Sequence, residues 1–96
     1  MIEIRETETY SRWFKRLRDR QARFRILARI RLLSLGNPGN VEPVGEGVSE
    51  MKIDYGPGYR VYYQQRGRTP AILLAGGDKR TQKRNIQNAK ELARGL

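Results

Sequence analysis

The chain has 96 residues and contains neither cysteine nor histidine. Without thiols its fold cannot depend on disulfide bonds, and thiolate metal sites are excluded. Histidine is the commonest general base and metal ligand near neutral pH, so catalysis would have to use Lys, Arg, Tyr, Asp or Glu. We therefore expect neither a metal ion nor another cofactor.

Long apolar runs are also missing. No stretch approaches the roughly 18 to 20 residues that a membrane-spanning helix needs. The first ten residues, MIEIRETETY, lack the apolar centre of a secretory signal. A chain this short has room for one modest core. These absences predict a cytoplasmic protein that does not contact the membrane and forms a single domain over residues 1–96.

Acidic residues are scarce beside basic ones, with 10 Asp and Glu against 20 Lys and Arg and a formal net charge of +10. Ten of the cations lie in residues 1–35, together with only four acids, so the charge is not confined to a tail. A folded body this basic favours a polyanionic partner, such as RNA, DNA or an acidic protein, over a neutral small molecule.

The apolar pattern of the first 36 residues predicts a strand followed by two helices. Ile2 and Ile4 alternate with charged residues, which is typical of a short, half-buried strand. Two stripes at helical spacing follow and predict a helical hairpin that ends near Gly36, with Asp19 as a possible cap between the helices. The stripes consist of Tyr10, Trp13, Phe14 and Leu17, and then of Ala22, Ile26, Ile30 and Leu33.

The remaining residues predict a sheet and a final helix. Residues 41–47 are interpreted as an irregular approach to the sheet, and alternation over 50–55 and 59–64 predicts a β-hairpin. The continuously apolar residues 71–75 predict a strand that is covered on both faces and lies at the sheet centre. A helix with a narrow apolar stripe is expected to start near Arg80.

The register of the β-hairpin follows from its apolar residues. A turn over 56–58 would pair Tyr55 with Tyr59 and Ile53 with Val61, because a slip of one residue would turn the cations toward the core. The opposite face would then carry the polar set Glu50, Lys52, Asp54, Arg60 and Tyr62.

This polar face has two interpretations. Cations, carboxylates and a phenol on a rigid sheet can bind a phosphodiester, stabilise developing charge and exchange protons without a metal. The same residues are typical of an open, solvated face with weak cross-strand ion pairs, and the pattern alone favours this interpretation.

The stretch AGGDKRTQKRNI, residues 75–86, raises the question of phosphate binding. It is not a P-loop, because Asp78 stands where that motif requires Lys. A strand end that leads into a helix start can still offer free N–H groups to a phosphate. The alternative is a turn followed by a solvated basic helix. The nearby cations are Lys79, Arg80, Lys83 and Arg84.

Five segments in order along nearly the whole chain resemble the addiction-module killer proteins, a phage-associated, HigB-like branch of the RelE/ParE toxin superfamily. They are RIxxRI (25–30), GNPG (36–39), PVGEGVSE (43–50), IDYGPGYRVYY (53–63) and LLAGGDKRTQ (73–82). The resemblance implies an α+β fold: a RelE-like compact domain with an N-terminal strand, a helical hairpin, an antiparallel sheet and a short C-terminal helix.

The resemblance also implies a function. It predicts the toxin of a type II toxin–antitoxin system, a metal-independent, ribosome-dependent mRNA endonuclease that uses the RNA's own 2′-OH to attack the adjacent phosphate. The implied partners are a cognate antitoxin of the helix-turn-helix type, mRNA on the ribosome, and operator DNA only through the antitoxin complex. ParE-like relatives instead poison DNA gyrase, so a gyrase poison and a catalytically inert co-repressor or nucleic-acid-binding member stay open as alternatives.

Some site residues follow from the same resemblance. Lys52 and Arg60 match the sheet cations that carry the phosphate chemistry, and Lys79 matches a later cation. Relatives often place a Tyr or His late in the chain, whereas the last aromatic residue here is Tyr63. Proton transfer is therefore assigned to Lys52, Lys79 or Tyr62. The predicted catalytic set is Lys52, Arg60, Tyr62 and Lys79, and the predicted RNA-binding set is Arg80, Lys83 and Arg84.

Overall fold

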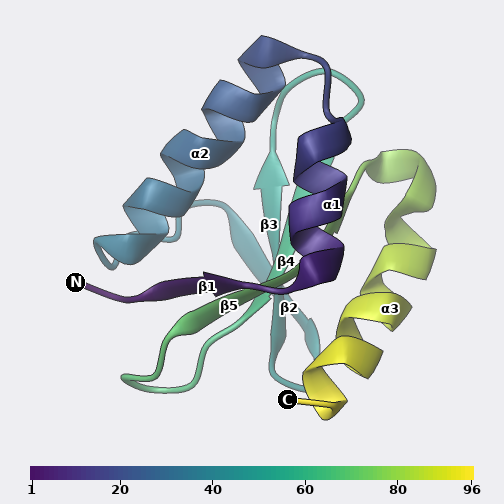
Figure 1. Cartoon of the computed structure of the whole chain (residues 1–96). Helices are drawn as coiled ribbons and strands as arrows, with labels where there is room; N and C mark the ends of the chain where they lie inside the picture. Colours follow the sequence, from purple (N-terminus) through teal and green to yellow (C-terminus); the bar gives the residue numbers. More distant parts are fainter.

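The computed structural model describes residues 1–96 and contains one five-stranded sheet with helices on both faces (Figure 1). A short 3₁₀ turn, Lys79–Thr81, precedes the last helix. None of the helices has the length and apolar character needed to cross a membrane. The strands and helices are β1 (Ile4–Glu6), α1 (Glu8–Arg16), α2 (Arg20–Ser34), β2 (Val41–Gly45), β3 (Val48–Ile53), β4 (Tyr59–Gln64), β5 (Ala71–Gly77) and α3 (Gln82–Arg94).

The strand order is β1-β5-β4-β3-β2, with β1 parallel to β5 and all other neighbours antiparallel. This confirms the expected α+β class with an N-terminal strand, two helices and a C-terminal helix. The sheet is mixed, because β1 pairs in parallel with β5, which lies far from it in the sequence. The predicted sheet centre was wrong: β4 is the central strand, and β5 lies one place toward the edge.

The central strand is β4 instead of β5 because of residues 41–47, which were expected to be irregular. They form strand β2 and a tight turn into β3. Pro43 and a bulge between Pro43 and Gly45 hide the alternation that would have predicted a strand. The turn requires left-handed backbone at Glu46, with φ of 55°, and at Gly47, with φ of 78°. An extra strand beyond β3 makes β4 the middle of five.

The predicted helical hairpin is confirmed, including its cap. Asp19 accepts hydrogen bonds from the N–H groups of Gln21 (2.9 Å) and Ala22 (3.2 Å), which begins α2. Thr7 caps α1 in the same way through the N–H of Tyr10, at 3.1 Å. These side chains satisfy N–H groups that no helical carbonyl can reach. The hairpin ends at Gly36, whose φ of 88° terminates α2.

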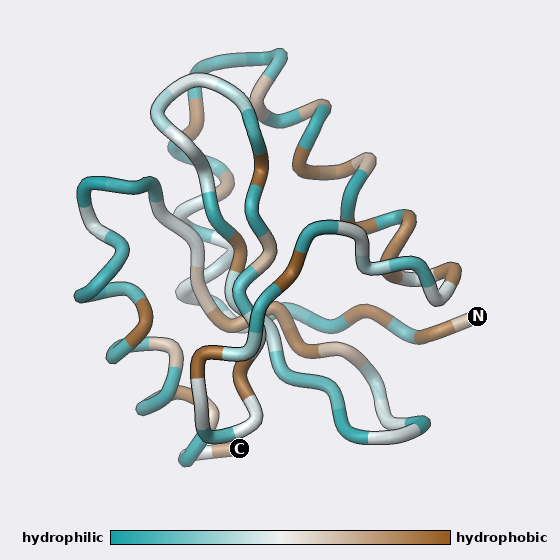
Figure 2. The backbone as a smooth tube through the Cα atoms, turned by 180° about the vertical axis from the view of Figure 1, so that it is seen from behind, coloured by the Kyte–Doolittle hydropathy of each residue, from teal (hydrophilic) through white to brown (hydrophobic).

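The two faces of the sheet carry separate cores. The helical stripes bury Tyr10, Ile26 and Leu33 against one face, where they meet Met51 and Val61. On the opposite face, α3 covers a second cluster that includes Tyr62 and Ala89. In Figure 2 hydrophobic colour recurs along α2 and in the strands, whereas hydrophilic colour prevails along α3. The final helix therefore holds to the sheet by a narrow stripe, as predicted.

The β3–β4 register differs from the prediction by two residues. Ile53 pairs with Tyr59 and Met51 with Val61, because the turn takes up residues 54–58. A shift of two residues preserves the side-chain alternation, so the predicted division into an apolar and a polar face is retained. Tyr55 leaves the sheet.

Tyr55 has a separate role outside the sheet. Its hydroxyl donates to the carboxylate of Asp19 at 2.9 Å. The residue that caps α2 is therefore also tied to the hairpin turn. Arg25 of α2 also lies over the Tyr55 ring, so these two contacts connect the start of α2 to the turn after β3.

Candidate active site

The polar face of the hairpin centres on one carboxylate. Glu50 is 2% exposed, and its Oε2 atom accepts hydrogen bonds from the Tyr62 hydroxyl (3.0 Å) and from Nε2 of Gln82 (2.9 Å). Nε of Arg60 lies 3.7 Å from the same oxygen and forms an ion pair. We call these four residues the Glu50 network.

Strand pairing and the start of α3 assemble the Glu50 network. Glu50 and Tyr62 are direct partners across β3 and β4. Arg60 lies two residues before Tyr62, so its side chain is on the same face. Gln82 is the first residue of α3, and its side chain donates to Glu50 from the helix that covers this face of the sheet. A buried carboxylate needs this number of donors because an unpaired buried charge is strongly destabilising.

Arg60 is held in place while one of its N–H groups lacks a partner. Nη1 donates to the carbonyl of Gly58 at 2.6 Å, and the side chain is only 12% exposed. Nε is buried and makes no hydrogen bond. A buried donor without an acceptor costs about 1 to 3 kcal/mol, and such groups are a feature of functional sites. Arg60 is thus a fixed cation whose Nε faces Glu50 inside the fold.

Tyr62 is fully buried and donates its hydroxyl hydrogen to Glu50. Burial, reinforced by the bond to Glu50, raises the pKa of Tyr62 well above its ordinary range. The phenol is therefore neutral near pH 7 and already committed as a donor. This placement favours a role for Tyr62 in orienting Glu50 over a role in exchanging a proton with a substrate.

The two predicted catalytic lysines come from the two strands that flank β4, the strand of Arg60: Lys52 is in β3, and Lys79 follows the end of β5. Lys52 is the direct partner of Arg60 across β3 and β4, and its Nζ lies 3.3 Å from Oε1 of Glu42 on β2. Lys79 is exposed, and its backbone N–H donates to the Pro57 carbonyl at 3.3 Å. That bond brings the segment after β5 against the hairpin turn that also anchors Arg60.

Comparison with known proteins gives the family. Residues 12–95 match the model of the phage-derived protein Gp49-like family (DUF891). The chain belongs to this family. It is also 43% identical, over 95 residues, to an uncharacterized protein of Haemophilus influenzae, covering 99% of this chain and 96% of the relative. The Gp49-like family is a RelE-like, toxin-like family, which confirms the resemblance at this level. The HigB-like branch stays a prediction.

In this Gp49-like chain, the cations predicted to bind RNA lie at the start of α3. Lys83 and Arg84 are exposed. Arg80 is also exposed but pairs with Asp78, whose carboxylate lies 3.2 Å from its guanidinium. Asp78 further accepts from the N–H of Arg80 at 2.9 Å. The Asp78 carboxylate thus already accepts from the backbone N–H group of this turn, so the segment is not an open phosphate-binding site. RNA binding by the three cations stays a prediction.

The two glycines that end β5 serve close packing. A Cβ atom at Gly76 would overlap the indole of Trp13 on α1. A Cβ atom at Gly77 would overlap the side-chain amide of Asn85 on α3. Helices on opposite faces therefore approach this strand end more closely than any larger residue would allow. This contact sets the position of α3 and hence of Gln82.

Glu50 and Gln82 were not among the catalytic or RNA-binding residues that the sequence predicted. Glu50 was placed correctly on the polar face, but the possibility that this face is open to solvent is wrong, because α3 covers it. Asp54, which was assigned to the same face, lies exposed in the turn. The burial of Glu50 depends on where α3 returns, and no local pattern contains that information. No three Asp, Glu, His or Cys side chains cluster into a metal-binding group.

Proposed function

We propose that this Gp49-like protein is the toxin of a type II toxin–antitoxin system, that it belongs to a HigB-like branch, and that it cleaves mRNA on the ribosome. The observation that supports this proposal is the state of Arg60. A cation that Glu50 and the Gly58 carbonyl fix on a rigid sheet, beside Lys52, is suited to a phosphodiester. The toxin-like family supplies the context.

The proposed reaction needs charge stabilisation more than covalent chemistry from the protein. The RNA 2′-oxygen loses its proton and bonds to the adjacent phosphorus, while the bond to the 5′-oxygen breaks and that oxygen gains a proton. Negative charge grows on the non-bridging phosphate oxygens, where Arg60 and Lys52 would stabilise it. Lys52 and Lys79 are the side chains proposed to transfer the two protons.

Glu50 and Tyr62 have supporting roles in this proposal. Glu50 holds the guanidinium of Arg60, and Tyr62 with Gln82 orients Glu50. Tyr62 was first assigned to proton transfer, but its complete burial favours a positioning role. A catalytic cation needs such support, because an error of about 1 Å in placement costs on the order of a hundredfold in rate.

The proposed biological setting follows from the same family. Residues 1–96 would act as one cytoplasmic domain, neutralised by a cognate antitoxin of the helix-turn-helix type. Operator DNA would be contacted only through the antitoxin complex. The excess positive charge suits RNA and the ribosome, on which the mRNA would be cut.

Alanine substitutions of the two sheet cations test the proposal. Arg60→Ala and Lys52→Ala should each lower cleavage roughly a hundredfold, because each removes stabilisation of transition-state charge. Cleavage is measured by mapping transcript 5′-ends after tightly controlled expression, and folding by circular dichroism. Arg66→Ala is the matched control, since Arg66 is exposed in the β4–β5 turn. Folded variants that are fully toxic would rule out the catalytic assignment.

Salt dependence separates RNA binding from the gyrase alternative. If three or more phosphates are engaged, affinity for RNA should fall at least about tenfold between roughly 50 and 200 mM salt, because bound counterions are released. Fluorescence anisotropy with a labelled, uncleavable RNA measures this. A flat response would favour an apolar protein target.

A further inference from the structure

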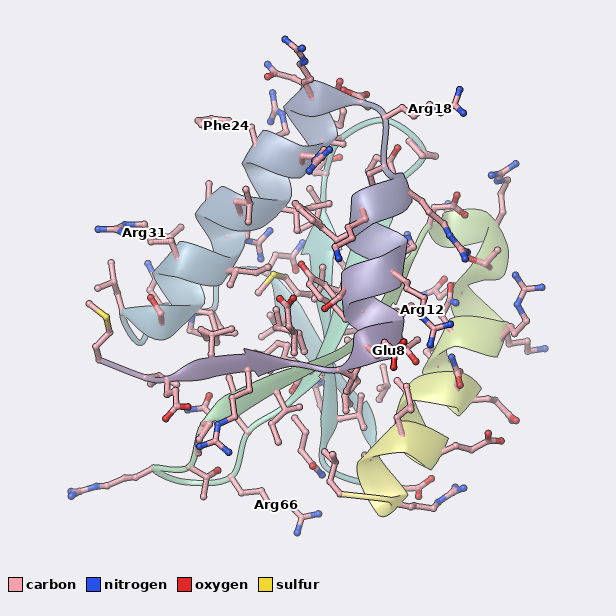
Figure 3. The ribbon with its side chains drawn as sticks, viewed as in Figure 1. Glu8, Arg12, Arg18, Phe24, Arg31 and Arg66 are labelled. Atoms are coloured by element: carbon pink, nitrogen blue, oxygen red, sulfur yellow. The ribbon has the colours of Figure 1, made fainter.

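The solvent-facing side of α2 carries an apolar stripe. Figure 3 shows Phe24 and Arg31 extending from α2 on the same side, away from the rest of the chain. The side chains of Phe24, Leu27 and Leu35 are 69%, 54% and 54% exposed. We call the following five residues the α2 outer stripe: Phe24, Leu27, Ala28, Arg31 and Leu35. Their spacings of three, one, three and four residues place them on one face of the helix.

This stripe lies opposite the side of α2 that builds the core. Ala22, Ile26 and Leu33 point into the sheet and are almost completely buried. The helix is therefore already anchored without its outer apolar residues. Large apolar side chains that the fold does not use, and that gather on one face, indicate a surface for another molecule.

The charge around the stripe is uncompensated. α2 contains five arginines and no acid, and none of these arginines forms a salt bridge. Arg20, Arg23 and Arg31 are exposed. Asp19, at the start of α2, is already engaged by two backbone N–H groups and by the Tyr55 hydroxyl. The surface thus combines apolar contact area with free positive charge.

A hollow adjoins the stripe between α2 and the end of β3. It has a volume of about 500 Å³, and its lining includes Phe24, Ala28 and Ile53. Arg25 and Arg29 also line it. An apolar side chain seated there would lie beside these two cations and the carboxylate of Asp54, with the other exposed arginines of α2 around it. This arrangement suits a segment in which apolar anchors alternate with carboxylates.

We propose that the α2 outer stripe is a docking surface for an acidic amphipathic helix of a protein partner. From Phe24 to Leu35 the stripe extends about 16 Å, which corresponds to three helical turns and to anchors at helical spacing. The partner helix places apolar residues on Phe24, Leu27 and Leu35 and carboxylates beside the arginines.

Other occupants fit the stripe less well. RNA would pair with the arginines but would leave the exposed leucines without an apolar counterpart. A second copy of this chain would set arginine against arginine, at a net charge of +10 on each side. A bilayer surface needs a broad apolar face, whereas the broad face of α2 is turned into the core.

The inference goes beyond the proposed cleavage, because the stripe and the Glu50 network lie on opposite faces of the sheet and share no residue. Only the choice of probe rests on the proposed function. The probe is the purified product of the adjacent open reading frame, the expected antitoxin. Loss of cleavage in Arg60→Ala would leave the docking result unaffected, so the two proposals fail separately.

Isothermal titration calorimetry with this probe tests the surface. The double variants Phe24→Ser/Leu27→Ser and Arg20→Glu/Arg31→Glu should each weaken binding about tenfold or more, because they remove central anchors or reverse the charge. Arg66→Glu/Arg68→Glu is the matched control, since both residues are exposed in the β4–β5 turn, and it should bind as the parent chain does. Amide exchange in residues 24–35 should slow on binding.

Three results would overturn the docking surface. The first is no binding of the probe to the parent chain. The second is binding that both stripe variants leave unchanged. The third is a loss of affinity for RNA or for anionic vesicles in the stripe variants while the probe still binds. In each variant, growth arrest without the probe should persist, because no residue of the Glu50 network has changed.

Discussion

The Glu50 network and the α2 outer stripe use arginine in opposite ways. Arg60 is 12% exposed and is held by Glu50 and by the Gly58 carbonyl. Arg23 and Arg31 of α2 are exposed and have no acidic partner. A buried cation must have partners within the fold, because its desolvation is costly, whereas an exposed one needs none. Exposed and unpaired arginines therefore leave their charge for another molecule.

The largest effect should come from placing one carboxylate in the buried core and another on the exposed stripe. Val61→Asp would bury an unpaired charge, because Val61 is completely buried in the core beneath α1 and α2. We expect a loss of several kcal/mol, enough to unfold a domain of ordinary stability. Phe24→Asp, on the exposed stripe, should change the free energy of unfolding by only about 0.5 kcal/mol.

Urea unfolding monitored by circular dichroism measures both variants. Equal destabilisation by the two substitutions would mean that Phe24 supports the fold, and the stripe would no longer be a surface that the fold does not use. A folded Val61→Asp protein would contradict the core assignment.

The second prediction concerns the carboxylate at the centre of the network. Glu50→Ala leaves a largely buried Arg60 without its ion pair and Tyr62 without its acceptor, and should cost about 3 kcal/mol. Glu50→Gln keeps an acceptor for Tyr62 and should cost less. Arg31→Ala, which breaks no pair, should stay within about 0.5 kcal/mol of the parent chain. Chemical denaturation supplies all three values, and an Arg31→Ala effect as large as that of Glu50→Ala would refute the contrast.

The third prediction concerns alkaline pH and the buried face. Burial and the bond to Glu50 raise the pKa of Tyr62 in the folded state. Its contribution to stability is therefore complete below the unfolded value of about 10 and is lost as pH rises above it. Tyr62→Phe should reduce this alkaline loss. The urea midpoint between about pH 8 and pH 11 measures it, and an unchanged slope in Tyr62→Phe would contradict the assignment.

The smallest effect is expected at the exposed start of α2. The hydrogen bond from Tyr55, followed by that from the Ala22 N–H, lowers the pKa of Asp19. Its contribution is present above the unfolded value of about 3.9 and is lost as pH falls below it. Asp19→Asn can still cap the helix, so stability near pH 7 should change little while the acid sensitivity decreases. Thermal melts between about pH 3 and pH 7 test this, with greater acid sensitivity in Asp19→Asn as the opposing result.

Local signals were sufficient for the helices and for the two faces of the hairpin. Apolar spacing of three and four residues predicted both stripes, and the side chain of Asp19 predicted the start of α2. Alternation placed Glu50, Arg60 and Tyr62 on one face, and the error of two residues in the register did not change this. Each of these features depends on residues that are close in sequence, where periodicity and capping act directly.

The sequence by itself determined the α+β class, the positions of the helices and the residues that share each sheet face, because these follow from short-range pattern. Only the tertiary structure decided that residues 41–45 complete the sheet, that the turn over 54–58 shifts the register by two, and that Glu50 is buried. These outcomes depend on long-range contacts. The Gly77–Asn85 approach brings α3 onto the polar face and encloses Glu50 beneath Gln82.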